Sequence, residues 1–199
     1  MIYDVQSLKT IYAKYSNINQ KVAIEAKKGN LVRIKRGLYT DNIKVDAPVI
    51  ANVCCSPSYI SFEYALSFYG LIPEYVSALT SACYGKKNNK MYISKGRSFE
   101  YQSIPNDAYP YGICFLKNEA NMTYKIASKE KALCDIVYSK YPVRSYKDLE
   151  MMLFLDLRIE EEELSKLDAS FIQENVPLYH SNSVSTLARY LMRSHKQKA

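Results

Sequence analysis

The pattern of apolar and polar positions near the start of the chain predicts two short helices. Four apolar side chains recur at the i, i+3, i+4 and i+7 spacing of one helical stripe, namely Leu8, Ile11, Tyr12 and Tyr15. Asp4 or Ser7 can cap this first helix. After a turn at Ser16 and Asn17, a second helix is predicted to end near Gly29. Its inward arc is formed by Ile18, Val22, Ala23 and Ala26.

The segment from Leu31 to Tyr39 has the pattern of a two-stranded hairpin. Leu31 or Val32 can pack inward with Ile34 and Leu38, and Gly37 permits a tight bend or a bulge. Two helices followed by such a hairpin predict a winged helix-turn-helix. Because a full helix-turn-helix domain has three helices, either the first helix has two roles or a small turn lies within residues 2–5.

Beyond the hairpin, the pattern predicts a second and larger domain. Asp46 and Pro48 interrupt regular structure, so residues 41–53 are interpreted as a connection. The two domains are therefore placed at residues 1–42 and 50–199. The larger one opens with a helix whose apolar stripe consists of Phe62, Ala65, Leu66 and Tyr69.

The pattern then changes to short apolar or alternating runs, which predict the strands of a mainly antiparallel sheet. These runs cover residues 76–83, 91–93, 99–104, 112–116 and 123–126. Helices are expected from residues 128 and 145 and from the acidic run 160–163, followed by an amphipathic helix over 184–192. The predicted fold class is α+β, a winged helix-turn-helix followed by an α+β domain that ends in helices.

Positive charge is concentrated in the first domain. Residues 1–40 contain eight basic and two acidic side chains, a net charge of +6, and the whole chain carries +7. This concentration favours a polyanionic partner, because neutralised phosphates release their condensed counterions. A merely solvated, lysine-rich surface is the alternative.

The outer arc of the second helix has the chemistry of a DNA-reading surface. In the major groove, amides can read adenine and apolar groups can contact thymine methyls. The arc carries Gln20, Lys21, Ile24, Lys27 and Lys28, while Arg33, Lys35 and Arg36 project from the hairpin. A polar surface helix is the other interpretation of the arc alone. The basic hairpin beside it, which can clamp adjacent phosphates, favours double-stranded DNA.

A second basic segment follows the first predicted strand of the sheet. It contains Lys86, Lys87, Lys90, Lys95 and Arg97, and no acidic residue occurs between Cys83 and Ser98. This segment either extends the DNA footprint, faces an acidic or nucleotide-bearing partner, or only promotes solubility.

Several classes of protein are disfavoured by the sequence. No run approaches the roughly 18 apolar residues of a membrane span, and the N-terminus lacks a signal-peptide core, so a cytoplasmic protein without a membrane partner is expected. Five cysteines without a C-x-x-C pair and two late histidines predict reduced thiols, no metal site and no cofactor. Phosphate-binding loops and hydrolase motifs are missing, so we expect no enzyme.

A few polar residues of the larger domain are candidates for a site. Glu63, Glu130 and Asp135 could gather in the fold around a metal, and Glu130, Lys131 and Asp135 could form a polar group. Helix capping and i, i+4 pairing explain Glu130 and Lys131 equally well, and an exposed helical glutamate explains Glu63.

Three segments resemble the AbiEi antitoxins of type IV toxin–antitoxin systems. Residues 29–39 (GNLVRIKRGLY) are similar to the wing segment of that family. Residues 57–73 (PSYISFEYALSFYGLIP) resemble the start of its C-terminal domain, and residues 127–138 (ASKEKALCDIVY) resemble a later helix. The segments have the order and spacing of the family, whereas residues 141–199 add no match.

The resemblance implies a repressor of its own operon that binds inverted repeats in its promoter. It also implies a second domain that counteracts a nucleotidyltransferase-like toxin, without a stable complex, in abortive phage defence. The antitoxin-domain candidates are then Glu63, Lys86, Lys87, Arg97, Glu130 and Lys131. The alternative is a winged-helix regulator whose larger domain senses a small ligand in a deep apolar pocket with convergent polar groups.

Overall fold

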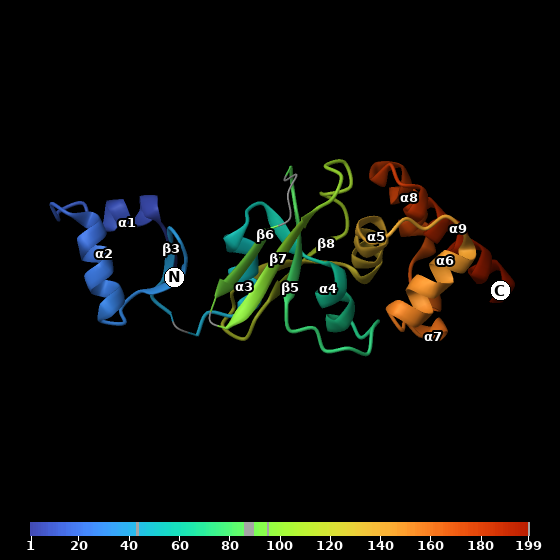
Figure 1. The fold of residues 1–199 in the computed structure, drawn as a ribbon, viewed down its shortest axis with the longest axis horizontal. Helices are drawn as coiled ribbons and strands as arrows, with labels where there is room; N and C mark the ends of the chain where they lie inside the picture. Colours follow the sequence, from blue (N-terminus) through green and yellow to red (C-terminus); the bar gives the residue numbers. More distant parts are fainter. Residues whose placement is uncertain (43, 86–89, 95, 199) are drawn as a thin grey trace.

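The chain is a mixed α+β protein with a small N-terminal head and a larger body. The computed structural model describes residues 1–42, 44–85, 90–94 and 96–198. Residues 195–198 are described by their backbone alone. The molecule is elongated, with the head at one end, a group of helices at the other, and a six-stranded sheet between them (Figure 1). No helix in the described ranges is both long and apolar enough to span a membrane.

The head consists of two helices and a three-stranded antiparallel sheet of order β1-β3-β2. Its elements are β1 (Ile2–Asp4), α1 (Val5–Ile11), α2 (Ile18–Lys27), β2 (Val32–Lys35) and β3 (Leu38–Thr40). Both helices begin at caps that the sequence indicated, because Asp4 accepts from the Ser7 N–H and Asn17 accepts from the Gln20 N–H. The segment before α1 is a strand and not the suggested turn.

The hydrophobic core of the head is very small. Three buried side chains form it, Leu8, Val22 and Leu31. The predicted stripe of the first helix is buried only at Leu8, because α1 ends at Ile11 and leaves Ile11 and Tyr15 largely exposed. In α2, the expected inward residue Ala23 is exposed, and Glu25 is buried in its place.

The joint between head and body lies on the face of the head sheet that points away from the small head core. Ile34 and Leu38 belong to the hydrophobic core of the body. The ammonium group of Lys35 donates to the backbone oxygen of Cys54 and lies 4.8 Å from the ring centre of Tyr92. The head is therefore held by its hairpin.

The predicted connection of residues 41–53 is wrong from residue 47 onward. Ala47–Cys54 forms α3, which packs against the sheet of the body. Pro48 was taken as an interruption, but it lies in the first turn of α3, where a backbone N–H has no helical partner to lose.

The sheet of the body is mixed, so the expectation of a mainly antiparallel sheet is only partly met. Its order is β6-β7-β5-β4-β9-β8, and the β5–β7 and β4–β9 pairs are parallel. The strands are β4 (Ser58–Ile60), β5 (Leu79–Cys83), β6 (Lys90–Ser94), β7 (Arg97–Ser103), β8 (Ile113–Lys117) and β9 (Thr123–Ala127). The sequence did not predict β4, because its three residues are all buried and show no alternation.

The helices of the body begin beside the sheet and continue at its far end (Figure 1). After α3 they are α4 (Phe62–Phe68), α5 (Lys129–Ser139), α6 (Tyr146–Glu150), η1 (Met151–Asp156), α7 (Glu161–Ser165), α8 (Ala169–Tyr179) and α9 (Asn182–Lys198). The predicted apolar face of α5 is confirmed, since Ala132, Leu133, Ile136 and Val137 are buried. The sequence did not predict α8, which contains Pro177.

Candidate functional site

The outer face of α2 is open to solvent, as the DNA-reading hypothesis requires. Gln20, Lys27 and Lys28 are exposed, and Ile24 keeps 40% of its surface accessible. The Asn17 cap starts the helix, so Gln20 lies in its first turn. In a recognition helix the N-terminal residues are those that contact base edges. The face thus combines an amide, an exposed aliphatic group and two ammonium groups.

Lys21 lies at the flank of this face and is engaged within the head. Its Nζ donates to Glu25 Oε1 at 2.6 Å and lies 4.7 Å from the ring centre of Tyr15. The hydrogen bond from Lys21, followed by one from Asn30, holds the pKa of the Glu25 carboxyl below its ordinary value. The bond to Glu25 also raises the pKa of Lys21. The Lys21–Glu25 pair thus links successive turns of α2.

The hairpin presents two arginines. Arg33 and Arg36 are exposed, whereas Lys35 turns to the joint described above instead of projecting. The pairing of β2 with β3 shifts register between Arg33 and Lys35, which reverses the face of Lys35. Gly37 has a φ of +79°, and a Cβ there would lie 3.2 Å from a methyl of Val5.

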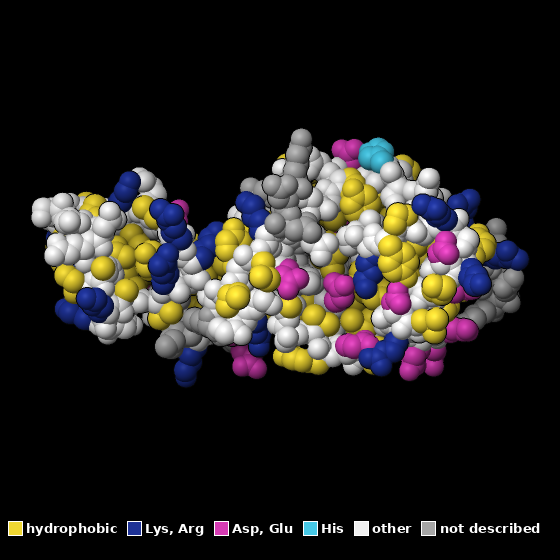
Figure 2. Space-filling view, in the orientation of Figure 1, with side chains coloured by type: hydrophobic (Ala, Val, Ile, Leu, Met, Phe, Trp, Pro, Cys, Tyr) yellow, Lys and Arg dark blue, Asp and Glu magenta, His cyan; other side chains and the backbone are white. Residues whose placement is uncertain are grey.

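The two ends of the molecule differ in charge. On the face drawn in Figure 2, the charged side chains of the head are almost all lysine and arginine, whereas acidic and basic side chains are interspersed over the body. A polyanion would therefore meet the head more favourably than the body on this face.

The second basic segment is only partly described. Lys86, Lys87 and Lys95 lie outside the described residues. Lys90 is exposed at the start of β6, and Arg97 is half-buried at the start of β7. The role of this segment stays an open prediction.

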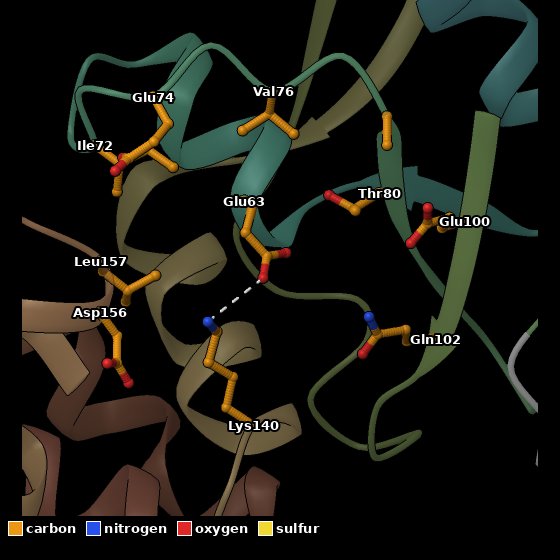
Figure 3. Close-up of a pocket in the computed structure, with 11 residues that line it drawn as sticks. Glu63, Ile72, Glu74, Val76, Thr80, Glu100, Gln102, Lys140, Asp156 and Leu157 are labelled. Atoms are coloured by element: carbon orange, nitrogen blue, oxygen red, sulfur yellow. Dashed lines mark ion pairs between the residues drawn. The ribbon is translucent and has the colours of Figure 1, made fainter. Parts of the chain in front are cut away.

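A pocket of about 390 Å³ lies between α4, the sheet and the C-terminal helices (Figure 3). Glu63 of α4 points toward Lys140, with their charged atoms 3.8 Å apart. Glu100 and Gln102 face the same space from β7. Apolar lining comes from Ile72, Val76, Ala78 and Leu157.

The pocket has an excess of negative charge, with four carboxylates and one ammonium group among its lining residues. Asp156 accepts from the Tyr141 hydroxyl, and this bond raises the pKa of Tyr141 to about 12. Glu74 pairs with Arg158, but its Oε2 atom is buried and has no hydrogen-bond partner among the described residues. Such a lining offers acceptors to a cationic ligand.

The body also contains a fully buried polar network centred on α5. Asp135 Oδ2 accepts from the hydroxyls of Tyr59 at 2.9 Å and Ser61 at 2.6 Å, and Oδ1 accepts from Tyr179 at 2.6 Å. Lys131 Nζ lies 3.2 Å from Asp135 Oδ1 and donates to Tyr179 and to the Ala108 carbonyl, both at 2.7 Å.

The charged groups of this network are buried and hydrogen-bonded. Asp135 is 0% and Lys131 is 2% exposed. Burial, and next the charge of Asp135, raises the pKa of Tyr59 and Tyr179 well above the ordinary value. Because the charges are paired and hydrogen-bonded in the interior, the network joins β4, α5 and α8 as a structural unit.

The candidate acids of the body do not converge. Asp135 lies in the buried network and Glu63 in the pocket. Glu130 is half-buried and accepts from the Asp168 N–H at 3.4 Å. Within the described ranges, no group of three or more His, Cys, Asp or Glu residues could hold a metal ion.

Sequence reasoning missed several residues of these sites. Tyr59, Ser61 and Tyr179 carry no pattern that marks them as partners of Asp135, because they come from separate elements. Lys131 and Asp135 did have a signal, since their i, i+4 spacing places both beside the apolar face of α5.

Comparison with known proteins leaves the family of the chain open. No protein-family model matches the sequence, and no curated protein matches it either.

Proposed function

We propose that the head is a winged-helix DNA-binding unit and that the protein represses its own operon. The observation that carries this proposal is that both the outer face of α2 and two arginines of the hairpin are exposed, within a head of net positive charge. The element order of the head supports it, because the hairpin β2–β3 follows α2 directly in the chain and pairs with β1 in one small sheet. A helix flanked by a basic hairpin is a common arrangement for reading a groove and holding its phosphates.

In this proposal α2 enters the major groove. Gln20 reads a base through its amide, Ile24 contacts a thymine methyl, and Lys27 and Lys28 neutralise phosphates. Arg33 and Arg36 hold the backbone beside the groove, while Lys35 holds the hairpin on the body. Inverted repeats in the promoter would take two copies of the chain.

A binding titration of the full chain tests the proposal. Fluorescence anisotropy compares the duplex upstream of its own gene with a scrambled duplex at two salt concentrations. We expect preference for the upstream duplex and a steep loss of affinity with salt, because several phosphates are neutralised. Equal salt-sensitive binding to both duplexes would reduce the head to a nonspecific anchor, and no binding would reject the proposal.

For the body we propose an antitoxin role in the cytoplasm, on the resemblance of residues 57–73 and 127–138 to AbiEi antitoxins. The body counteracts a nucleotidyltransferase-like toxin without holding it in a stable complex, and this role needs no catalysis by the chain. Co-expression with a toxin encoded beside the gene tests it. Restored growth without co-purification of the toxin is expected, and unchanged toxicity would reject the role.

The pocket favours a second candidate, a regulator that senses a cationic small molecule. Its unpartnered Glu74 oxygen and its apolar wall fit a ligand with an amine and an alkyl chain. Thermal unfolding with spermidine as the probe tests this candidate. A rise in midpoint that Glu100→Gln weakens would support it, and no rise would reject it.

A further inference from the structure

Two cysteine thiols face each other at the end of the body that holds the head. The Sγ atoms of Cys55 and Cys83 are 2.8 Å apart. A disulfide bond has a sulfur separation of about 2.05 Å, so a shift of less than about 1 Å would join them.

The backbone, and not only a side-chain rotamer, places these thiols together. Ser58 of β4 pairs with Cys83 of β5 in antiparallel register. The Ser58 hydroxyl donates to the carbonyl oxygen of Cys55, so the chain turns back over three residues and brings Cys55 beside Cys83. A further bond from the Tyr84 N–H to the Pro57 carbonyl, at 3.3 Å, extends this arrangement.

The other cysteines are poorly suited to forming a disulfide. Burial raises the pKa of the Cys134 thiol, and burial is also the main cause of a raised pKa at Cys54. Since the thiolate is the reactive form, both stay thiols longer. Cys114 is half-buried on β8, an edge strand of the sheet, and has no thiol partner among the described residues.

The thiol pair is directly coupled to the joint. Cys55 follows Cys54, whose carbonyl oxygen accepts from Lys35 of the hairpin. Any shift of the Cys55 backbone toward Cys83 would be transmitted to the neighbouring carbonyl that anchors Lys35. The same hairpin carries Arg33 and Arg36.

We propose that Cys55 and Cys83 form a redox modification site that a hydroperoxide oxidises to a disulfide, and that the disulfide alters how the joint holds the head. The effect on DNA rests on the proposed DNA-binding function. Cys55 is the first target, because it is 6% exposed and Cys83 only 1%.

The chemistry balances with the hydroperoxide as the oxidant. The Cys55 thiolate attacks the peroxide, the O–O bond breaks, and a sulfenic acid and an alcohol (water, for hydrogen peroxide) form. The Cys83 thiol then attacks the sulfenic sulfur, the S–S bond forms, the S–O bond breaks, and water leaves. Two electrons pass from the thiols to the peroxide, and thiol–disulfide exchange with a small dithiol reverses the change.

Thiol counting on the full chain tests the modification. After hydrogen peroxide treatment, denaturation and alkylation, we expect three alkylated cysteines instead of five, a mass lower by two hydrogen atoms before alkylation, and a peptide linking Cys55 to Cys83. Cys55→Ser and Cys83→Ser should abolish the change, and the control Cys114→Ser should keep it. Five alkylated cysteines in the wild type, or a link to a different cysteine, would reject the site without relying on any variant.

Two separate measurements test the effect of the disulfide on the joint. Oxidation should change the rate of proteolysis within residues 41–46 and shift affinity for the upstream duplex by about fivefold or more, the range of a modest coupling between sites. The proteolysis readout needs no DNA, so it stands if the repressor proposal fails. A disulfide that leaves both the proteolysis rate and the DNA affinity unchanged would overturn the switch.

Discussion

At the scale of single residues, burial decides what each lysine does. Lys27 and Lys28 are exposed and available to a phosphate, Lys35 is held at the joint, and Lys131 is enclosed in the polar network. The side chains have the same chemistry, so their roles differ only through their surroundings.

In the proposed complex, Arg33 contacts a phosphate and Gln20 contacts a base, so their replacement should have different effects. Arg33→Ala should weaken binding to all sequences and lower the salt slope by about 0.9, the share of one phosphate. Gln20→Ala should relax preference at one base pair by roughly 1–3 kcal/mol. Anisotropy titrations over a salt series and a set of mutated duplexes measure both effects.

Arg144→Ala is a matched control, because Arg144 is exposed but lies in the body. It should leave affinity and salt slope unchanged. If Gln20→Ala weakens every duplex equally, the base-reading assignment of Gln20 is wrong.

The buried polar network should contribute strongly to the stability of the body. Asp135→Asn leaves the Lys131 ammonium without its counter-charge, so we expect the free energy of unfolding to fall by about 3–5 kcal/mol. Urea denaturation followed by circular dichroism measures the change. Glu130→Gln, one turn away on the half-buried side of α5, should cost less than about 1 kcal/mol. Similar losses for both variants would contradict the structural role of the network.

At the scale of elements, α2 shows how a helix can bury an acid. Glu25 is 8% exposed because Lys21 and Asn30 donate to its two carboxylate oxygens. A sequence pattern that ranks residues by polarity places Glu25 outside, and the hydrogen bonds that reverse this placement come from the helix itself and from the loop after it.

The stability of the head should therefore depend on pH. The folded-state pKa of Glu25 is lowered, so its contribution is present above the unfolded value of about 4.3 and is lost as the pH falls through the lowered pKa. Urea unfolding followed through NMR signals of α2, from neutral pH to about pH 3, measures this loss. Glu25→Gln should flatten the profile.

Glu119→Gln is the control, since Glu119 is an exposed acid of the body. Its profile should match the wild type. A Glu25→Gln profile that still falls like the wild type would assign the pH dependence to other groups.

At the scale of the whole molecule, the head depends on the body more than the body depends on the head. The head has three buried core residues of its own, and two more of its side chains, Ile34 and Leu38, pack into the body. A chain of about 40 residues usually needs disulfides, metals or association to fold.

Separating the two parts should show this asymmetry. We expect residues 1–42 to be unfolded alone and residues 41–199 to fold, with some loss of stability from uncovered contacts around Val45 and Val49. Circular dichroism and thermal unfolding measure both fragments. The body fragment should also keep its toxin-counteracting activity, and a folded fragment that fails to protect cells would contradict this division of labour.

The sequence by itself determined the local elements and the charge of the head. Periodicity located α1, α2, α5, α9 and five of the six body strands, because amphipathic spacing reflects which side of an element meets water. The distribution of lysine and arginine along the sequence assigned most of the net positive charge to the head. These properties depend on neighbours along the chain, so they can be read without the fold.

Only the tertiary structure decided the rest. It made Ala47–Cys54 a helix, inserted β4 into a mixed sheet, turned Lys35 to the joint, and joined Asp135 to Tyr59, Ser61 and Tyr179. It also brought Cys55 beside Cys83 and enclosed the pocket. Each of these depends on contacts between residues far apart in the chain, and no local pattern encodes such contacts because burial and hydrogen bonding are set by the neighbours that folding supplies.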